Sequence, residues 1–370
     1  MSIKKYSSGS WVTVPYRKYE TATDTITSLP KTIIGDGQPI SSYTIKGNMS
    51  QSGTPTPSNP VYPAETGDKT ANLFDKNAAT IGYYVSSSTG DLVQNSPSMA
   101  SDYIPIEQGQ QYYWNDPTSR GNAGAFYDSN KTYISGWSSS PTKYVFTAPN
   151  GASYVRLTAT ASNIDNLQLN RGEAALDYEP FGYKIPILSN GTTYPAYLAE
   201  PIRKINTYAD SLASSGTVSR SIKQVAFTGQ EEWEHYGSSV FWTKVENNGV
   251  LVNGNGLSNS YIYNPTTSNV PTTIENGECG LTSSNGRVYI KNTNYANATA
   301  FKQYLADRYS AGTPVTVWYV LATATTETFT APSIPTSGTA QTFDVDTTLA
   351  PSEVSLTYHG WHEHEDTEFT

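Results

Sequence analysis

The residues best suited to binding chemistry lie between positions 113 and 156, where aromatic side chains stand near polar ones. Sugar rings bound by proteins stack on exposed aromatic faces, while polar side chains bind their hydroxyl groups. The candidate saccharide-binding residues are therefore Trp114, Trp137, Tyr113, Tyr133, Asp128, Asn130 and Arg156, with Asp116 and Arg120 as further polar groups. Because side chains alternate between the two faces of a strand, roughly half of the aromatic residues should instead face a core.

Two weaker patterns could hold a metal ion, although we predict no resident metal or cofactor. His362 and His364 would lie on one face of a strand and could meet their symmetry copies at an oligomer axis. A solvated acidic tail explains the same residues. Calcium held by acidic loops around Asp128 is the other possibility, but no EF-hand spacing supports it.

The densest acidic cluster offers a possible hydrolase site. Glu231, Glu232, Glu234 and His235 surround Trp233, and paired carboxylates can cleave glycosidic bonds. A solvent-facing turn accounts for the cluster equally well. The sequence contains no nucleophile elbow, HEXXH motif, phosphate loop or dinucleotide fingerprint, and Cys279 has no evident partner base. We therefore predict that the chain is not an enzyme.

The composition indicates which elements must position these residues. Of the 370 residues, 36% are hydrophobic and 15% are charged, and Gly, Pro and Tyr are abundant. Short apolar runs of β-branched and aromatic residues, broken by turn residues, predict a mainly all-β protein. Between 72 and 182 such runs predict a β-sandwich or jelly roll with strands at 81–85, 103–106, 111–114, 124–127, 132–134, 144–147, 154–160 and 166–170.

Changes in composition along the chain divide it into four predicted segments. Residues 1–45 predict an N-terminal arm, 46–71 a Pro-rich extended linker, 72–182 the β-sandwich, and 183–370 a second β-rich domain. The second domain should contain one α-helix, at about 299–310, with Phe301, Tyr304, Leu305 and Tyr309 on its apolar face. We expect the sandwich to be inserted into this domain, which residues 43–71 would complete.

Charge and targeting signals narrow the possible partners. The formal net charge is -9 and the pI is near 5.0, so the chain lacks the basic stripe needed to bind nucleic acid. No apolar run is long enough to span a membrane, and no signal peptide follows Met1. We therefore expect synthesis in the cytoplasm without membrane insertion. With a single cysteine, stability must come from sheet packing and oligomer contacts.

Several short sequence segments along the chain resemble segments of tail and baseplate proteins from phages and prophages of Gram-positive bacteria (Firmicutes). The N-terminal segments lie at 25–37, 45–48, 51–60 and 72–75. The segments that resemble a carbohydrate-binding jelly roll lie at 102–106, 125–131 and 154–157, and later segments lie at 178–186, 200–204, 312–319 and 351–354. The resemblance implies a homotrimer in the virion tail, anchored to other tail or baseplate proteins by its N-terminal part.

The combined prediction is a receptor-binding tail protein that holds host cell-wall or surface polysaccharide and adsorbs through many weak contacts. Two alternatives stay open. In one, the sandwich is a purely structural spacer or decoration; in the other, the protein is a polysaccharide depolymerase. Aromatic residues exposed in a groove would favour binding, and paired carboxylates in a cleft would favour cleavage.

Overall fold

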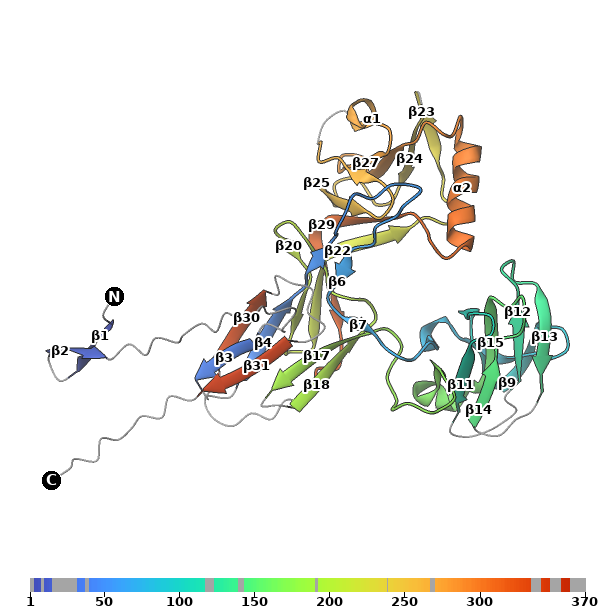
Figure 1. Ribbon diagram of the computed structural model, residues 1–370, viewed down its shortest axis with the longest axis horizontal. Helices are drawn as coiled ribbons and strands as arrows, with labels where there is room; N and C mark the ends of the chain where they lie inside the picture. The colour runs from blue at the N-terminus through green and yellow to red at the C-terminus, as the bar shows by residue number, and fades with distance from the viewer. Residues whose placement is uncertain are drawn as a thin grey trace.

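A computed structural model describes residues 3–7, 10–14, 32–36, 40–116, 123–138, 143–189, 192–237, 239–266, 270–333, 341–346 and 354–359. Most of the described residues belong to β-sheets with antiparallel pairing, so the all-β prediction is confirmed (Figure 1). At the N-terminus, β1 (Ile3–Ser7) and β2 (Ser10–Val14) form a hairpin.

The segment 72–171 forms two facing sheets. The larger sheet has the order β13-β12-β15-β9-β8, with β10 also paired to β15; the smaller has the order β14-β11-β16. The strands are β8 (Thr80–Val85), β9 (Leu92–Ala100), β10 (Ile104–Pro105), β11 (Gln111–Asn115), β12 (Gly124–Tyr127), β13 (Tyr133–Trp137), β14 (Lys143–Thr147), β15 (Tyr154–Thr160) and β16 (Gln168–Arg171), with short helices η1 (Lys76–Ala78) and η2 (Ala161–Asn166).

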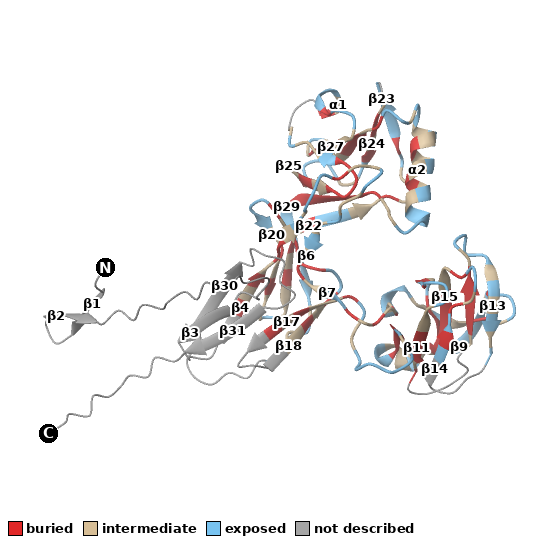
Figure 2. Cartoon of the chain, in the orientation of Figure 1, coloured by how far each residue is buried: buried red, intermediate tan, exposed pale blue. Residues whose placement is uncertain are grey.

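Aromatic side chains fill the space between these two sheets. Trp114 from β11 meets Phe74 edge to face at 5.6 Å, while Phe146 from β14 packs against Phe126 at 5.5 Å and Trp137 at 5.3 Å. Each fully buried ring stabilises the fold by about 2–3 kcal/mol. Buried residues line both sheets of the sandwich in Figure 2.

The remaining described strands form two further larger sheets and a helix-covered sheet. One sheet has the order β18-β17-β31-β3, with β7 also paired to β17, and another has the order β25-β29-β22-β21-β4-β30. Their strands are β3 (Thr32–Asp36), β4 (Ile40–Lys46), β7 (Asp68–Lys69), β17 (Tyr183–Ser189), β18 (Thr192–Leu198), β21 (Ser211–Ala213), β22 (Thr217–Ala226), β25 (Leu251–Ser258), β29 (Thr316–Thr328), β30 (Gln341–Asp346) and β31 (Val354–His359). Strands on both sides of the sandwich in the sequence therefore share sheets.

The third sheet has the order β23-β24-β28-β27-β26. Its strands are β23 (Glu234–Tyr236), β24 (Val240–Lys244), β26 (Ile262–Tyr263), β27 (Glu278–Thr282) and β28 (Arg287–Lys291); short pieces elsewhere are β5 (Met49–Ser50), β6 (Ala64–Glu65), β19 (Lys204–Ile205), β20 (Tyr208–Ala209) and α1 (Val270–Thr273).

The predicted helix is α2 (Ala298–Ser310), and its existence is confirmed. The Asn297 side chain caps its first turn by accepting from the Ala300 N–H, and Phe301 stacks on Phe241 from β24 at 4.3 Å. Its predicted apolar face was partly wrong, because Tyr309 is 50% exposed. The ring lies beyond the edge of the packed face at the last turn.

The chain enters and leaves the sandwich at neighbouring strands. β7, which precedes it, pairs antiparallel with β17, which follows it: Lys69 lies opposite Tyr183 and Asp68 opposite Lys184. Figure 1 shows the two connecting segments running together toward the sandwich. This pairing is the geometry that an inserted domain requires.

Asn72 joins these two connecting segments. Its buried side-chain amide donates hydrogen bonds to the carbonyl oxygens of Leu167 and Glu179, each at 3.0 Å. Its Oδ1 accepts from the N–H groups of Phe74 at 2.9 Å and Leu169 at 3.2 Å. One side chain thus satisfies backbone groups at both ends of the sandwich.

A buried charge cluster organises the sheets outside the sandwich. The Oδ1 atom of Asp210 accepts from the N–H groups of Ser221 at 2.7 Å and Ile222 at 2.8 Å, and its Oδ2 accepts from the Arg203 N–H at 3.1 Å. The Arg220 guanidinium lies 3.7 Å from the same carboxylate. These contacts tie β22 to the chain that leads into β21.

Arg203 extends the cluster toward other strands. Its guanidinium bonds to the carboxylates of Glu65 at 2.6 Å and Glu200 at 2.7 Å, and to the Gln224 side chain at 3.1 Å. The Trp318 indole N–H donates to the same Glu65 oxygen at 2.9 Å. Segments before and after the sandwich are therefore joined through one arginine.

We predict that Asn72→Ala lowers the free energy of unfolding of the sandwich by about 3 kcal/mol, because four buried backbone groups lose their partner. Hydrogen exchange in β15 and β16 of the full chain measures this loss. Asn77→Ala, at a nearby exposed position, is the matched control and should change stability by less than about 0.5 kcal/mol. Unchanged exchange in Asn72→Ala would show that this amide does not hold the joint.

We also predict a pH dependence at Asp210. Burial raises the pKa of its carboxyl to about 6, although the backbone N–H groups and Arg220 oppose the shift. Because the folded state then holds the proton more tightly than the unfolded state, this group's contribution to stability falls as pH rises through the interval up to about 6. The stability difference between the wild type and Asp210→Ala, measured by denaturant unfolding, should be larger at the acidic end of that interval. The opposite slope would mean that the arginines outweigh burial.

Candidate functional site

The strongest candidate site is the outer face of the larger sandwich sheet, where three tyrosines form a row across neighbouring strands. Tyr127 on β12 lies directly opposite Tyr154 on β15 and opposite Tyr133 on β13. On β15, Val155 and Leu157 belong to the core between the sheets. Strand alternation therefore turns Tyr154 and Arg156 to the outer face.

A fourth tyrosine, Tyr103, packs onto this row just before β10. Its ring meets Tyr127 edge to face at 4.8 Å and Tyr154 at 6.1 Å, while Tyr127 meets Tyr133 at 6.4 Å. We call these four residues the tyrosine face. Tyr103 and Tyr154 are half-buried, so each leaves part of its ring accessible.

The turn before β9 holds one half of the tyrosine face in place. The Tyr127 hydroxyl donates to the Gly90 carbonyl at 2.5 Å, and the Tyr133 hydroxyl donates to the Ser87 carbonyl at 2.7 Å. Burial raises the pKa of Tyr127, so this phenol stays neutral and remains a donor. The half of the face formed by Tyr103 and Tyr154 is the part open to a ligand.

Two cations lie over the open half. The Lys131 Nζ is 4.7 Å from the Tyr103 ring centroid and 5.8 Å from that of Tyr154, and the Arg156 guanidinium carbon is also 4.7 Å from Tyr103. Arg156 is 7% exposed, and its Nε donates to the Ser101 carbonyl at 2.9 Å. Cations at these distances are attracted to the face of an aromatic ring.

The β12–β13 turn fixes the position of Lys131. The Asp128 Oδ1 accepts from the N–H groups of Asn130 and Thr132, each at 2.8 Å, and the Lys131 N–H donates to the Asp128 carbonyl at 3.0 Å. Lys131 itself has a φ of 63°, in the left-handed region. This turn directs the lysine side chain back over the tyrosine face.

Part of the predicted binding set lies elsewhere. Trp114 is 1% exposed in the core between the sheets, and Tyr113, on the other side of β11, is also buried. Trp137 is half-buried and packs inward, with its ring 5.0 Å from Phe126. Trp114 and Tyr113 therefore present no ring face to a ligand, because β11 is the central strand of its sheet and is covered on both sides.

The other predicted polar residues separate into two groups. Arg156 and Tyr133 belong to the tyrosine-face region, and Asn130 is exposed in the adjoining turn. One carboxylate oxygen of Asp128 accepts hydrogen bonds within its own turn, and Asp116 is buried. In the described ranges, no group of three or more His, Cys, Asp or Glu residues is arranged so that it could hold a metal ion. Arg120, His362 and His364 lie outside the described residues.

The acidic cluster around Trp233 forms a structured turn. The Glu231 carboxylate accepts from the N–H groups of Thr228 at 2.7 Å and Gly229 at 3.0 Å, and from the Trp233 indole at 3.2 Å. These donors outweigh the effect of burial and lower the pKa of Glu231. His235 stacks on Phe241 at 5.1 Å. Glu231 is thus committed to structure, which leaves it poorly placed to serve as a catalytic acid.

Cys279 is fully buried, and burial raises the pKa of its thiol well above the ordinary range. A buried thiol with a raised pKa is a poor nucleophile.

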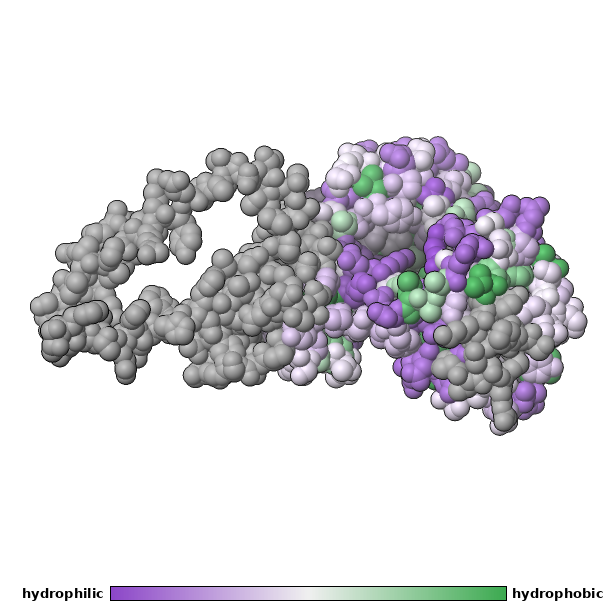
Figure 3. Space-filling model, turned by 60° about the horizontal axis from the view of Figure 1, so that its bottom comes forward, coloured by the Kyte–Doolittle hydropathy of each residue, from purple (hydrophilic) through white to green (hydrophobic). Residues whose placement is uncertain are grey.

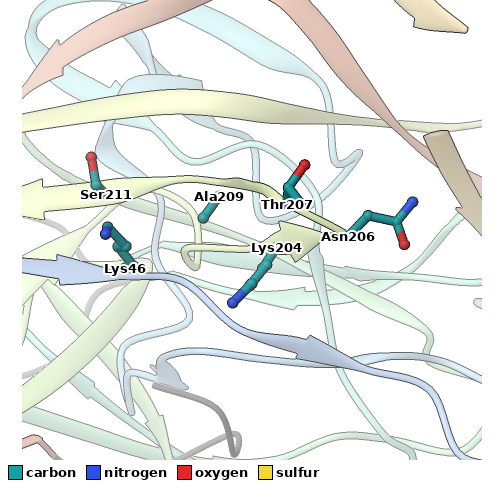
Figure 4. A pocket seen from close by; sticks show the side chains of 6 residues that line it. All are labelled: Lys46, Lys204, Asn206, Thr207, Ala209 and Ser211. Carbon is teal, nitrogen blue, oxygen red and sulfur yellow. The ribbon is translucent and has the colours of Figure 1, made fainter. Parts of the chain in front are cut away.

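A surface hollow of about 400 Å³ lies beside β4 and β19. Its lining residues are Lys46, Lys204, Asn206, Thr207, Ala209 and Ser211 (Figure 4). The side chains of Lys204 and Asn206 point away from each other in this view. The lining groups in this view do not converge on one point.

Sequence reasoning did not select Tyr103, Tyr127, Lys131 or Tyr154. The usable signal was the alternation of Tyr154 and Arg156 with Val155 and Leu157 on one strand, which places the tyrosine and the arginine on one face. The register that brings Tyr127 opposite Tyr154 joins strands distant in sequence, so alternation alone could not supply it.

Comparison with known proteins relates part of the chain to a phage tail. It is 32% identical over 123 residues to a tail fiber protein of Enterococcus phage phiEF24C. The similarity covers 30% of this chain and 6% of the phage protein, so it concerns one region of each. No family model and no solved structure matches the chain. None of the helices in the described ranges combines the length and hydrophobicity that crossing a bilayer requires.

Proposed function

We propose that this chain is a structural component of a phage tail that binds host cell-surface saccharide through the tyrosine face of its sandwich. The observation that carries the proposal is the half-buried pair Tyr103 and Tyr154 with Lys131 and Arg156 beside their rings. A partly exposed ring flanked by hydrogen-bond donors is the arrangement that holds a pyranose. The partial similarity to a phage tail fiber protein supports the setting.

The shape of the site fits weak contacts repeated in several copies. The tyrosine face offers only half-buried rings to a ligand, because Tyr127 is 2% exposed, and a small contact of this kind gives low affinity. Several copies on one virion raise the effective concentration and make attachment firm. We therefore propose a homotrimer whose N-terminal part attaches to other tail or baseplate proteins and whose sandwich, residues 72–182, faces the host.

The face of the molecule seen in Figure 3 has the character of a surface in contact with solvent. Figure 3 shows mainly hydrophilic and intermediate colours over the described surface in that view, with hydrophobic residues in small separate areas. Large apolar side chains that are exposed, such as Ile81, Ile134 and Val145, are spread over different strands of the sandwich. Scattered apolar residues of this kind are normal on a soluble surface.

We expect Tyr103→Ala in the full-length chain to reduce retention on purified cell walls of a susceptible Gram-positive strain about tenfold, because a stacked ring contributes about 1–2 kcal/mol. Sedimentation of the protein with walls from a panel of strains measures retention. Tyr309→Ala, which removes an exposed tyrosine from α2, is the matched control and should retain wild-type binding.

Circular dichroism and thermal unfolding establish that both variants fold. A folded Tyr103→Ala protein that binds as the wild type does would move the site away from the tyrosine face. Failure of the wild type to bind any wall would favour the alternative role of the sandwich as a spacer. Release of reducing sugars from the walls would instead favour a depolymerase.

A further inference from the structure

Two cations lie over the Tyr103 ring, in the open half of the tyrosine face. The Lys131 ammonium and the Arg156 guanidinium lie at the same distance, 4.7 Å, from the Tyr103 ring centroid. They can therefore be no farther apart than twice that distance. The whole chain carries a net charge of -9, so a pair of cations held this close stands out from its surroundings.

The backbone of Lys131 has a strained, left-handed conformation. A non-glycine residue at a φ of 63° is destabilised by about 1 kcal/mol, and glycine or asparagine suits the position better. The turn is over-determined by the Asp128 side chain, which holds the N–H groups of Asn130 and Thr132. Strain that the surroundings maintain in this way is concentrated at binding sites.

Neither cation is neutralised by a described carboxylate. Among the described residues, the ion pairs involve other lysines and arginines, and none includes Lys131 or Arg156. The Asp128 carboxylate accepts from N–H groups of its own turn. The open half therefore presents positive charge together with aromatic surface.

We propose that the ligand of the tyrosine face is an anionic saccharide, one that carries phosphate or carboxylate groups along its chain. This inference rests on the proposed function and adds the ligand class. Tyr103 and Tyr154 contact the sugar or polyol unit. Arg156, fixed by its bond to the Ser101 carbonyl, and Lys131, at the end of a flexible stem, bind the anionic group.

Removal of the Lys131 charge tests the inference in the full-length chain. Lys131→Gln should lower affinity for untreated walls about fivefold at moderate salt, as expected for loss of one partly exposed ion pair. Lys131→Gly should lose as much affinity while folding at least as stably, because glycine accepts the left-handed backbone. Lys69→Gln, which removes an exposed ammonium from β7, is the matched control and should bind as the wild type does.

Two chemical treatments of the walls identify the anion. Hydrofluoric acid removes phosphodiester-linked polymers, and carbodiimide coupling followed by borohydride converts carboxylates to alcohols. Loss of binding after the first treatment assigns a phosphate ligand, and loss after the second assigns a carboxylate ligand. In either case wild-type retention should fall as salt rises from about 0.05 M to about 0.5 M, because screening weakens attraction between charges.

The outcomes separate this inference from the function on which it rests. If Tyr103→Ala abolishes retention while both Lys131 variants and both treatments leave it unchanged, the saccharide is neutral and the anionic assignment is wrong. The binding function would then stand. If the wild type is not retained by any untreated wall, the proposed function fails and this inference fails with it.

Discussion

The structure depends on how the sandwich, residues 72–171, is connected to the parts of the chain before and after it. Asn72 satisfies this constraint by holding the entering strand to the Leu167 carbonyl and the Glu179 carbonyl of the returning segment. Glu179 reinforces the joint, since its carboxylate accepts from the Ala71 N–H at 2.8 Å and from the Lys184 ammonium at 2.7 Å. The two connecting segments are thereby held side by side close to the point where β7 pairs with β17.

Those sheets rely on buried charge for the same purpose. Arg203 and Asp210 are almost completely buried and both have polar partners. Arg203 binds Glu65, which lies 138 residues away, whereas Asp210 accepts from backbone N–H groups 7 to 12 residues away. A buried ion pair adds little net stability, because desolvation offsets attraction, but removing one partner leaves a costly unpaired charge. The cluster therefore favours one arrangement of the strands. Any register that moves Glu65 away from Arg203 would leave the Arg203 charge unpaired in the interior.

The sequence predicts elements better than it predicts which way their side chains point. Strands 124–127 and 154–160 were predicted with the bounds that the structure has, because each is a short β-branched or aromatic run between turn residues. β9 was missed because Pro97 and a polar run interrupt it. The binding residues were harder to predict than the strands. The sequence favoured the Trp114 and Trp137 indoles as surfaces on which a sugar would stack. A central strand buries Trp114, while a register shift between Phe126 and Tyr127 accompanies the pairing that turns Tyr133 outward.

The inward position of both indoles has a physical basis. A Trp ring buries more apolar surface than a Tyr ring, so the core of a lean, polar sandwich gains most by taking its Trp residues inward. Tyrosine combines an apolar ring with a hydroxyl that needs a partner, which suits a face where half of the rings are held by backbone carbonyls and half are open. Lys131 and Arg156 then complete a surface that is apolar and cationic at once. The proposed saccharide binding rests on this combination, because a partly exposed ring can stack on a sugar while nearby polar groups fix its orientation.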